Sequence, residues 1–285
     1  MTNATDISSR ALIVNLSISQ WSGRKLDRQV TDEVNADHAA DADAGRYNKM
    51  LVEKTALAPI QSIANAARIY VYRQTLPWGD NGDRVLMSTR YFDFMTQMRE
   101  FESAFKAAVD KLVGDYKAVV ERSRFRLNDM FKEADYPEEH EVENKFRMNI
   151  NIRPVPTAGD FRVAMGDDVV EEIKAQIEEN SQTLLNEAMQ TVWQEVKKTI
   201  THIQAKLADP KAIFKASTIE SIDDLIERIP HLNLTDDPNL EAFRKELKQN
   251  LQGLDAKELR KDEFVRSAAA EDAKRIMDQF AGMWG

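Results

Sequence analysis

The sequence contains no cysteine among its 285 residues. This absence excludes disulfides, catalytic thiolates and cysteine-ligated zinc or iron–sulfur centres. Glycine and proline are scarce, at 10 and 8 residues, which favours long regular elements and above all helices. No apolar run reaches the roughly 18–20 residues of a membrane span, and the first residues, MTNATD, do not resemble a secretory signal. We therefore expect a soluble, cytoplasmic protein.

The local motifs of common enzymes and cofactor sites are missing as well. There is no Walker A sequence, GxGxxG, GxSxG or HExxH. The histidines lie in four separate segments, at His38, His140, His202 and His231. A site assembled from distant residues needs no local motif, so this pattern predicts a non-enzyme without excluding an enzyme. We expect no cofactor and no metal.

Basic residues are fewer than acidic ones, and the formal net charge is −9. Residues 1–133 carry 19 Lys and Arg against 18 Asp and Glu, whereas residues 134–285 carry 20 against 30. The acidity therefore belongs to the second half. An acidic chain lacks the overall field of a non-specific nucleic-acid binder, although a local basic surface in the first half stays open.

Two long helical patterns are present. Apolar residues recur across 167–208 at steps of mostly three, four or seven, at Val169, Ile173, Ile177, Leu184, Ala188, Val192, Val196, Ile200, Ile203 and Leu207. A helix of that length runs roughly 60 Å and needs a partner along its side. A similar stripe with Phe94, Met98, Phe105 and Leu112 covers 89–131. We predict that these helices pair as one long antiparallel hairpin, with their apolar stripes packed together as in a coiled coil.

Period-two alternation predicts strands at 11–19 and 148–153, and 161–164 can return as a second strand of a short ribbon. Such a ribbon needs a third partner, and 11–19 is the best candidate. Further helices are expected at 24–35, 47–74, 217–229, 240–251 and 255–283, with N-caps at Asp237 and Asp255. The sequence from 76 to 83, LPWGDNGD, predicts a turn.

Together these patterns predict a mainly α protein with a small β-sheet (α+β). Its core is the long helical hairpin, with the β-ribbon at the hairpin tip and additional helices packed against it. We divide the chain into an N-terminal strand and helices (1–88), the hairpin with its ribbon connector (89–209), and C-terminal helices that pack on the hairpin (210–285).

Some apolar residues fall outside the main stripes. Met189 and Trp193 widen the apolar sector of the long helix, and Trp284 lies in an apolar tail. Helices from 210–285 can cover this sector, and so can a second copy of the chain. We therefore name these three residues as candidate contacts with an oligomer or another partner.

The alternative hypothesis is single-stranded nucleic-acid binding, as in DNA metabolism. Basic residues alternate with aromatic ones in the first half of the chain, a mixture that suits phosphate pairing and base stacking. The candidate contacts are Arg68, Arg73, Arg84, Arg90, Arg122, Arg124 and Arg126.

Several segments together resemble an uncharacterised family of tailed-phage and prophage proteins, a domain of unknown function. They are ALIVNLSISQWSGRKLD (11–27), TLPWGDNGDRVL (75–86), YFDFM (91–95), GDFRV (159–163) and LNLTDDP (232–238). The family carries no assigned chemistry, so the resemblance implies no catalytic residue. Genes of such proteins often lie near a MoxR-type ATPase gene, which implies an assembly or remodelling partner. We therefore expect a non-enzymatic phage assembly or adaptor protein that associates with itself, with another phage or host protein, or with a MoxR-type ATPase.

Overall fold

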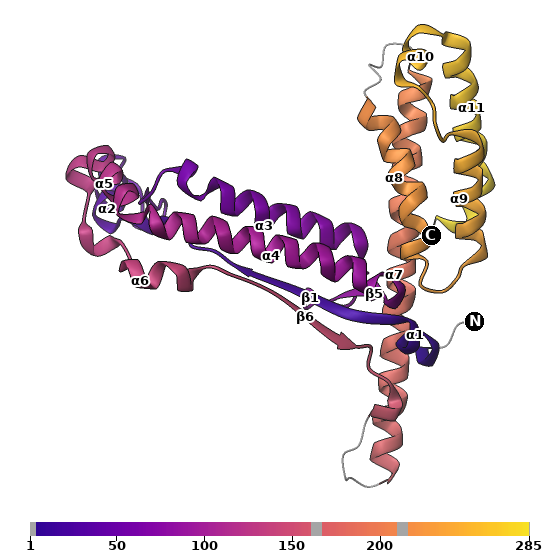
Figure 1. Cartoon of the computed structure of the whole chain (residues 1–285), viewed down its shortest axis with the longest axis horizontal. Coiled ribbons are helices and arrows are strands. Elements are labelled where there is room, and N and C mark those ends of the chain that lie inside the picture. Colours follow the sequence, from indigo (N-terminus) through magenta and orange to yellow (C-terminus); the bar gives the residue numbers. More distant parts are fainter. Residues whose placement is uncertain (1–3, 161–166, 210–215, 285) are drawn as a thin grey trace. The chain divides into compact units, whose positions relative to one another are not determined.

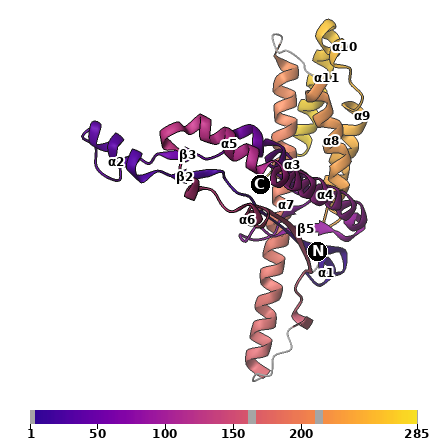
Figure 2. The same cartoon turned by 60° about the vertical axis from the view of Figure 1, so that its left-hand side comes forward.

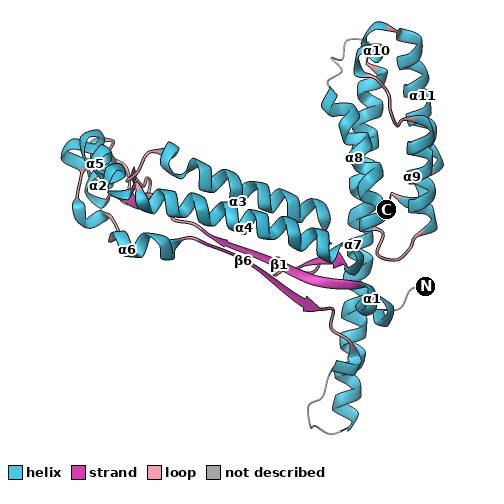
Figure 3. Cartoon of the chain, in the orientation of Figure 1, coloured by secondary structure: helices cyan, strands magenta, loops and turns pink. Residues whose placement is uncertain are grey.

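A computed structural model describes residues 4–160, 167–209 and 216–284 of the chain (Figures 1 and 3). The helices are α1 (Ala4–Arg10), α2 (Arg28–Asp37), α3 (Lys54–Gln74), α4 (Tyr91–Gly114), α5 (Tyr116–Leu127), α6 (Glu139–Val142), α7 (Asp167–Ala208), α8 (Ala216–Leu232), α9 (Pro238–Asn250), α10 (Ala256–Lys261) and α11 (Glu263–Gln279). The strands are β1 (Ala11–Ser19), β2 (Arg24–Leu26), β3 (Asn48–Met50), β4 (Leu76–Pro77), β5 (Arg84–Met87) and β6 (Arg147–Pro154). The 3-10 turns used below are η1 (Ser88–Arg90), η2 (Asn128–Met130), η3 (Glu133–Asp135) and η5 (Ala158–Asp160). The protein is thus mainly α-helical with a small β-sheet, as predicted.

The chain forms two compact units, and both are discontinuous in sequence. Unit 1 consists of Met1–Asn15, Val71–Phe94 and Asn151–Gly285, and unit 2 consists of Leu16–Tyr70 and Met95–Ile150. Each unit therefore draws on more than one of the three sequence segments 1–88, 89–209 and 210–285.

Unit 1 is built on α7, which runs without a break for 42 residues, as its spacing predicts. Its sequence contains no Gly or Pro, so nothing in the side chains interrupts the backbone hydrogen-bond ladder. The buried residues between Leu185 and Leu207 belong to one core with residues of α8, α9 and α11. Figure 1 shows these three helices alongside the C-terminal part of α7.

The small sheet has the strand order β4-β5-β1-β6. In unit 1, β1 pairs antiparallel with β5, from Ala11 opposite Met87 to Val14 opposite Arg84. Ala11, Ile13 and Met87 belong to the same core as α7. The predicted strands at 11–19 and 148–153 are confirmed, and β1 is the neighbour of β6, as expected for the third partner. The predicted strand at 161–164 lies outside the described residues.

Unit 2 has its own core, in which Leu57 and Ile60 of α3 cluster with Phe105, Val109 and Leu112 of α4. The two helices lie side by side in both views of the chain (Figures 1 and 2). Strands β2 and β3 pair antiparallel beside this core. These contacts make α3 the partner of α4 within unit 2.

The predicted pairing of 89–131 with 167–208 is therefore wrong. Phe105 of α4 and Val196 of α7 lie in different cores, and each helix face is covered by elements of its own unit. The predicted second rod is also divided, because α4 ends at Gly114 and α5 begins at Tyr116. Glycine weakens a helix interior by about 1 kcal/mol relative to alanine, which makes this position a natural break.

Three boundaries differ from the sequence prediction for local reasons. Residues 24–26 form strand β2, because Asp27 caps α2 by accepting a hydrogen bond from the Val30 backbone N–H. Residues 48–50 form strand β3, and α3 starts only at Lys54, with Pro59 inside it. The predicted helix 255–283 is divided by a second N-cap at Asp262, whereas the N-caps at Asp237 and Asp255 are confirmed.

The existence of two separate cores can be tested with one substitution in each. Ile200→Ala in unit 1 removes part of a fully buried side chain and should lower the free energy of unfolding by about 2–5 kcal/mol. Phe105→Ala in unit 2 should lower it by about 3–5 kcal/mol. Amide hydrogen exchange should then rise mainly in α7, α8 and α11 for the first variant and mainly in α3 and α4 for the second. Faster exchange in α4 caused by Ile200→Ala would instead support a shared hairpin seam.

Candidate functional site

The candidate oligomer contacts Met189 and Trp193 lie in the core of unit 1, with exposed fractions of 8% and 7%. The Trp193 indole Nε1–H donates a hydrogen bond to Asp237 Oδ2 at 3.1 Å. Asp237 also caps α9 by accepting from the Asn239 backbone N–H. Met189 and Trp193 therefore hold the helices of their own chain together. The prediction that they contact an oligomer or another partner at the surface is wrong, because both side chains are buried within unit 1.

Trp284 is anchored in the same place. Its ring centroid lies 5.8 Å from that of Trp193 and 6.0 Å from that of Phe243, both in edge-to-face geometry. Phe280 completes the cluster, 5.3 Å from Phe243. Such pairs add about 0.5–1.5 kcal/mol each beyond their buried area. The sequence left open whether helices from 210–285 or a second copy of the chain cover this apolar sector. In the structure, residues from 210–285 cover it.

The seven candidate arginines are divided between the units. Arg68 on α3 and Arg122, Arg124 and Arg126 on α5 belong to unit 2, whereas Arg73, Arg84 and Arg90 belong to unit 1. The structure therefore does not gather all seven in one unit, and three of them lie together on α5.

The arginines of unit 1 are engaged within the chain. Arg73 forms an ion pair with Asp224, and Arg90 pairs with Asp93 at 2.9 Å. The Arg84 guanidinium lies 4.6 Å from the centroid of the Tyr72 ring, and its Nε donates to the Thr75 hydroxyl at 2.6 Å. Burial lowers the Arg84 pKa, since the charged form loses hydration. These contacts fix β5 against the end of α3.

One arginine of the α5 trio lies beside an exposed aromatic ring. Phe125 is 77% exposed, and it follows Arg122 by three residues, so these two side chains share a helix face. Arg124 lies on another side, 4.5 Å from the centroid of the Phe131 ring. Arg126 donates to the Met50 carbonyl. On this face of α5 a basic and an exposed aromatic side chain thus meet at the surface in the predicted way.

A buried charge cluster that sequence analysis missed lies in unit 2. The Lys49 side chain is 2% exposed, and its ammonium donates to Asp135 Oδ2 at 2.6 Å, to Asp27 Oδ2 at 3.1 Å and to the Met130 carbonyl at 2.8 Å. Lys25 pairs with the other oxygen of Asp135 at 2.8 Å. All three ammonium donors of Lys49 are satisfied, so the cluster joins β3, the N-cap of α2 and turns η2 and η3.

The charges in this cluster stabilise one another. The hydrogen bond from Lys49 lowers the pKa of Asp27 below its usual range. Burial alone would raise the pKa of Asp135, but hydrogen bonds from Lys25 and Lys49 lower it overall. Burial likewise opposes the charged form of Lys49, and its bonds to Asp135 and Asp27 outweigh that effect and raise its pKa. A lysine held in the charged form lacks the free amine of a nucleophile or base.

A cavity beside α5 measures about 470 Å³ and is lined by Tyr116 and Tyr136 together with charged residues. Both tyrosine hydroxyls are already used, because Tyr116 donates to the Pro137 carbonyl at 2.8 Å and Tyr136 to the Leu51 carbonyl at 2.7 Å. Burial raises the pKa of Tyr116 to about 12. These rings therefore act as neutral hydrogen-bond donors that tie loops to the core.

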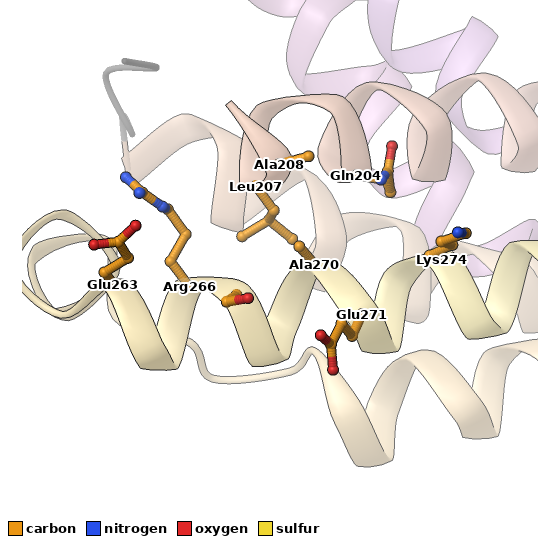
Figure 4. A pocket seen from close by; sticks show the side chains of 9 residues that line it. Gln204, Leu207, Ala208, Glu263, Arg266, Ala270, Glu271 and Lys274 are labelled. Atoms are coloured by element: carbon orange, nitrogen blue, oxygen red, sulfur yellow. The ribbon is translucent and has the colours of Figure 1, made fainter. Parts of the chain in front are cut away.

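Unit 1 has a smaller cavity of about 270 Å³ between the C-terminal end of α7 and α11. Figure 4 shows Leu207 and Ala270 at its centre, with Glu263, Arg266, Glu271 and Lys274 along α11. Acidic and basic groups alternate around the cavity, so it does not concentrate charge of either sign. The residues that line this cavity do not indicate a particular class of ligand.

Three phenyl rings stand out at the surface of the described chain. Phe92 on α4, Phe125 on α5 and Phe264 on α11 have exposed fractions of 79%, 77% and 83%.

Within the described residues, no cluster of three or more His, Asp or Glu side chains is placed to hold a metal ion. None of the helices described has both the length and the apolar character needed to cross a membrane.

The role of the Lys49 cluster can be tested with Lys49→Met. This change leaves Asp27 and Asp135 buried without their main partner, and it should lower the free energy of unfolding by about 3–5 kcal/mol. Lys25→Met is the matched control, because Lys25 contacts the same Asp135 but is 49% exposed, and its loss should cost about 1 kcal/mol or less. Equal effects of the two changes in urea unfolding at pH 7 would contradict the assigned role.

The stability of Lys49→Met should also depend on pH differently from that of the wild type. The lowered carboxyl pKa values stabilise the folded chain at pH values above the unfolded-state pKa of about 3.9, and this contribution is lost as the pH falls through the lowered values. The raised Lys49 pKa contributes below about pH 10.4 and is lost as the pH rises further. As the pH falls below about 3.9, Lys49→Met should therefore lose less stability than the wild type does.

Comparison with known proteins adds no relative. No protein-family model, no curated protein and no solved structure matches this chain.

Proposed function

We propose that this protein is a non-enzymatic assembly or adaptor component of a tailed phage, which acts by binding a second copy of itself or another phage or host protein. A MoxR-type ATPase is one candidate partner, and the host cytoplasm is the proposed location. The phage assignment rests on the resemblance of the segments at 11–27, 75–86, 91–95, 159–163 and 232–238.

The observation that carries the proposal is the exposure of Phe92, Phe125 and Phe264, each by more than three-quarters, on three different helices. Aromatic rings are enriched at protein interfaces because a ring buries a large apolar area with few rotatable bonds. A helix backbone also holds each ring in a defined direction. Three such rings on separate helices suit a protein that makes several contacts at once.

The buried polar contacts of the two units also support an interaction protein. The most buried lysine is committed to a structural cluster, and buried Trp193 ties α7 to α9 and the C-terminal tail. Both features give rigid units from which exposed side chains project. Rigid placement of contact residues reduces the entropy that a partner must overcome on binding.

Replacing the exposed rings one at a time tests the proposal. Phe92→Gln, Phe125→Gln and Phe264→Gln should each leave the free energy of unfolding within about 0.5 kcal/mol of the wild type, because the rings are exposed. At least one of them should lower the average mass in sedimentation velocity or abolish capture of one defined protein from prophage-bearing cells. Ala107→Gln is the control, since it places the same side chain at an exposed position of α4 without removing a ring. A single-chain mass at every concentration, together with no captured protein, would contradict the proposal.

A second candidate function is single-stranded nucleic-acid binding. The specific observation in its favour is the α5 face on which exposed Phe125 lies beside Arg122. A base can stack on the ring while the guanidinium group of Arg122 reaches a phosphate. Binding of this kind is driven largely by counterion release and weakens steeply with salt.

Gel shifts with single-stranded DNA at low and moderate salt test this candidate. Arg122→Ala should weaken binding and reduce the salt slope by about 1, and Phe125→Gln should weaken it further by removing the stacking surface. Lys248→Ala on α9 removes an equal charge elsewhere and should leave the affinity unchanged. The absence of any shift at low salt would eliminate nucleic-acid binding.

A further inference from the structure

The N-terminal part of α7 is packed differently from the rest of this helix. In this segment, which we call the α7 N-terminal segment (168–179), Val169 is 47% exposed, and Val170, Ile173 and Ile177 are only partly buried. From Leu185 onward, by contrast, the apolar residues of the stripe are buried in the core of unit 1. The apolar stripe therefore continues past the point at which the core ends.

The neighbours of the segment explain this difference. Helices α8, α9 and α11 lie beside the C-terminal part of α7, and among the described helices of unit 1 none lies along the N-terminal segment (Figures 1 and 2). The turn η5 contacts α7, and the Ser181 hydroxyl donates to the Pro156 carbonyl at 3.5 Å. One side of the stripe is thus approached by the chain at 155–160, and Val169 lies at its open edge.

Charge in this segment is strongly one-sided. It carries five carboxylates, at Asp168, Glu171, Glu172, Glu178 and Glu179, against a single basic residue, Lys174. Lys174 pairs with Glu171 at 2.8 Å, within the segment itself. Along the rest of α7 the acidic residues Glu187 and Glu195 are outnumbered by Lys197, Lys198 and Lys206. The excess of negative charge therefore coincides with the partly uncovered apolar residues.

We propose that the α7 N-terminal segment is a docking surface for a basic amphipathic helix of a partner protein. This inference rests on the proposed interaction function and adds the chemistry of one partner. Val169, Ile173 and Ile177 follow one another at steps of four, so they form the straight ridge that a second helix can pack against. Lysine or arginine residues flanking the apolar face of that helix would meet the carboxylates of α7.

A second copy of the same segment is a poorer occupant. A symmetric contact between two copies would place five carboxylates against five, and like charges across an interface are unfavourable. A basic helix removes that repulsion and gains attraction. Three turns of helix present less than the roughly 800 Å² per partner of a standard stable interface, so the contact should be reversible and sensitive to salt.

Fluorescence anisotropy with the full chain tests this proposal. The probe is a labelled peptide with leucine at helical i, i+3, i+4 and i+7 positions and lysine elsewhere. It should bind at low salt and weaken at moderate salt. A scrambled peptide of equal composition has the same charge without the apolar face and should bind at least about fivefold more weakly, a difference of about 1 kcal/mol.

A triple variant and a matched control locate the binding site. Val169→Ser with Glu172→Gln and Glu179→Gln should weaken peptide binding about fivefold to tenfold, a change of up to about 1.4 kcal/mol. Glu263→Gln with Glu271→Gln removes an equal charge from α11 and should change the affinity less than about twofold. Circular dichroism should show that both variants keep the helix content of the wild type.

Three results would overturn the proposal. The first is equal binding of the scrambled peptide, and the second is an unchanged affinity of the triple variant. The third is a loss of self-association in the triple variant that the basic peptide does not reproduce, which would assign the surface to a second copy. If the peptide fails to bind while the phenyl variants still alter association or capture, only this inference fails. If those variants alter nothing and the chain captures no partner, the proposed function fails as well.

Discussion

The burial of one face of α7 is the constraint on which unit 1 depends. Ile200, Ile203 and Leu207 are almost fully buried, and α8, α9 and α11 supply the side chains that cover them. A single helix of this length is not held straight by its own hydrogen bonds alone, since most helix stability in proteins comes from packing of an apolar face. The C-terminal tail belongs to this arrangement, because Trp284 lies against Trp193 and Phe243.

Unit 2 is held together by a different balance of forces. Its apolar core is smaller, and a buried ion cluster joins segments that are distant in sequence through Lys49, Asp27 and Asp135. Burying three charges costs hydration, and that cost is offset only when each charge is fully bonded. Such a cluster specifies which loops meet, since another arrangement would leave one charge without its partner.

These two arrangements bear on function through what they leave at the surface. The buried lysine and the tyrosines of the cavity beside α5 are engaged in structural hydrogen bonds. The exposed groups that remain prominent are phenyl rings, the basic face of α5 and the acidic, partly apolar start of α7. Rings and charged faces of this kind recognise other macromolecules through shape and charge. They are the reason for proposing an interaction protein.

Elements with local signals could be predicted from the amino-acid sequence. The unbroken helix at 167–208, the strands at 11–19 and 148–153, and the N-caps Asp237 and Asp255 all follow from spacing or from a cap within one turn. Which helix faces pack together is visible only in the folded chain. Periodicity shows that Phe105 and Val196 each lie on a buried face, but both faces are equally apolar, and nothing in either pattern names its partner. The same holds for Lys49, whose partners at 27 and 135 become neighbours only when the chain folds.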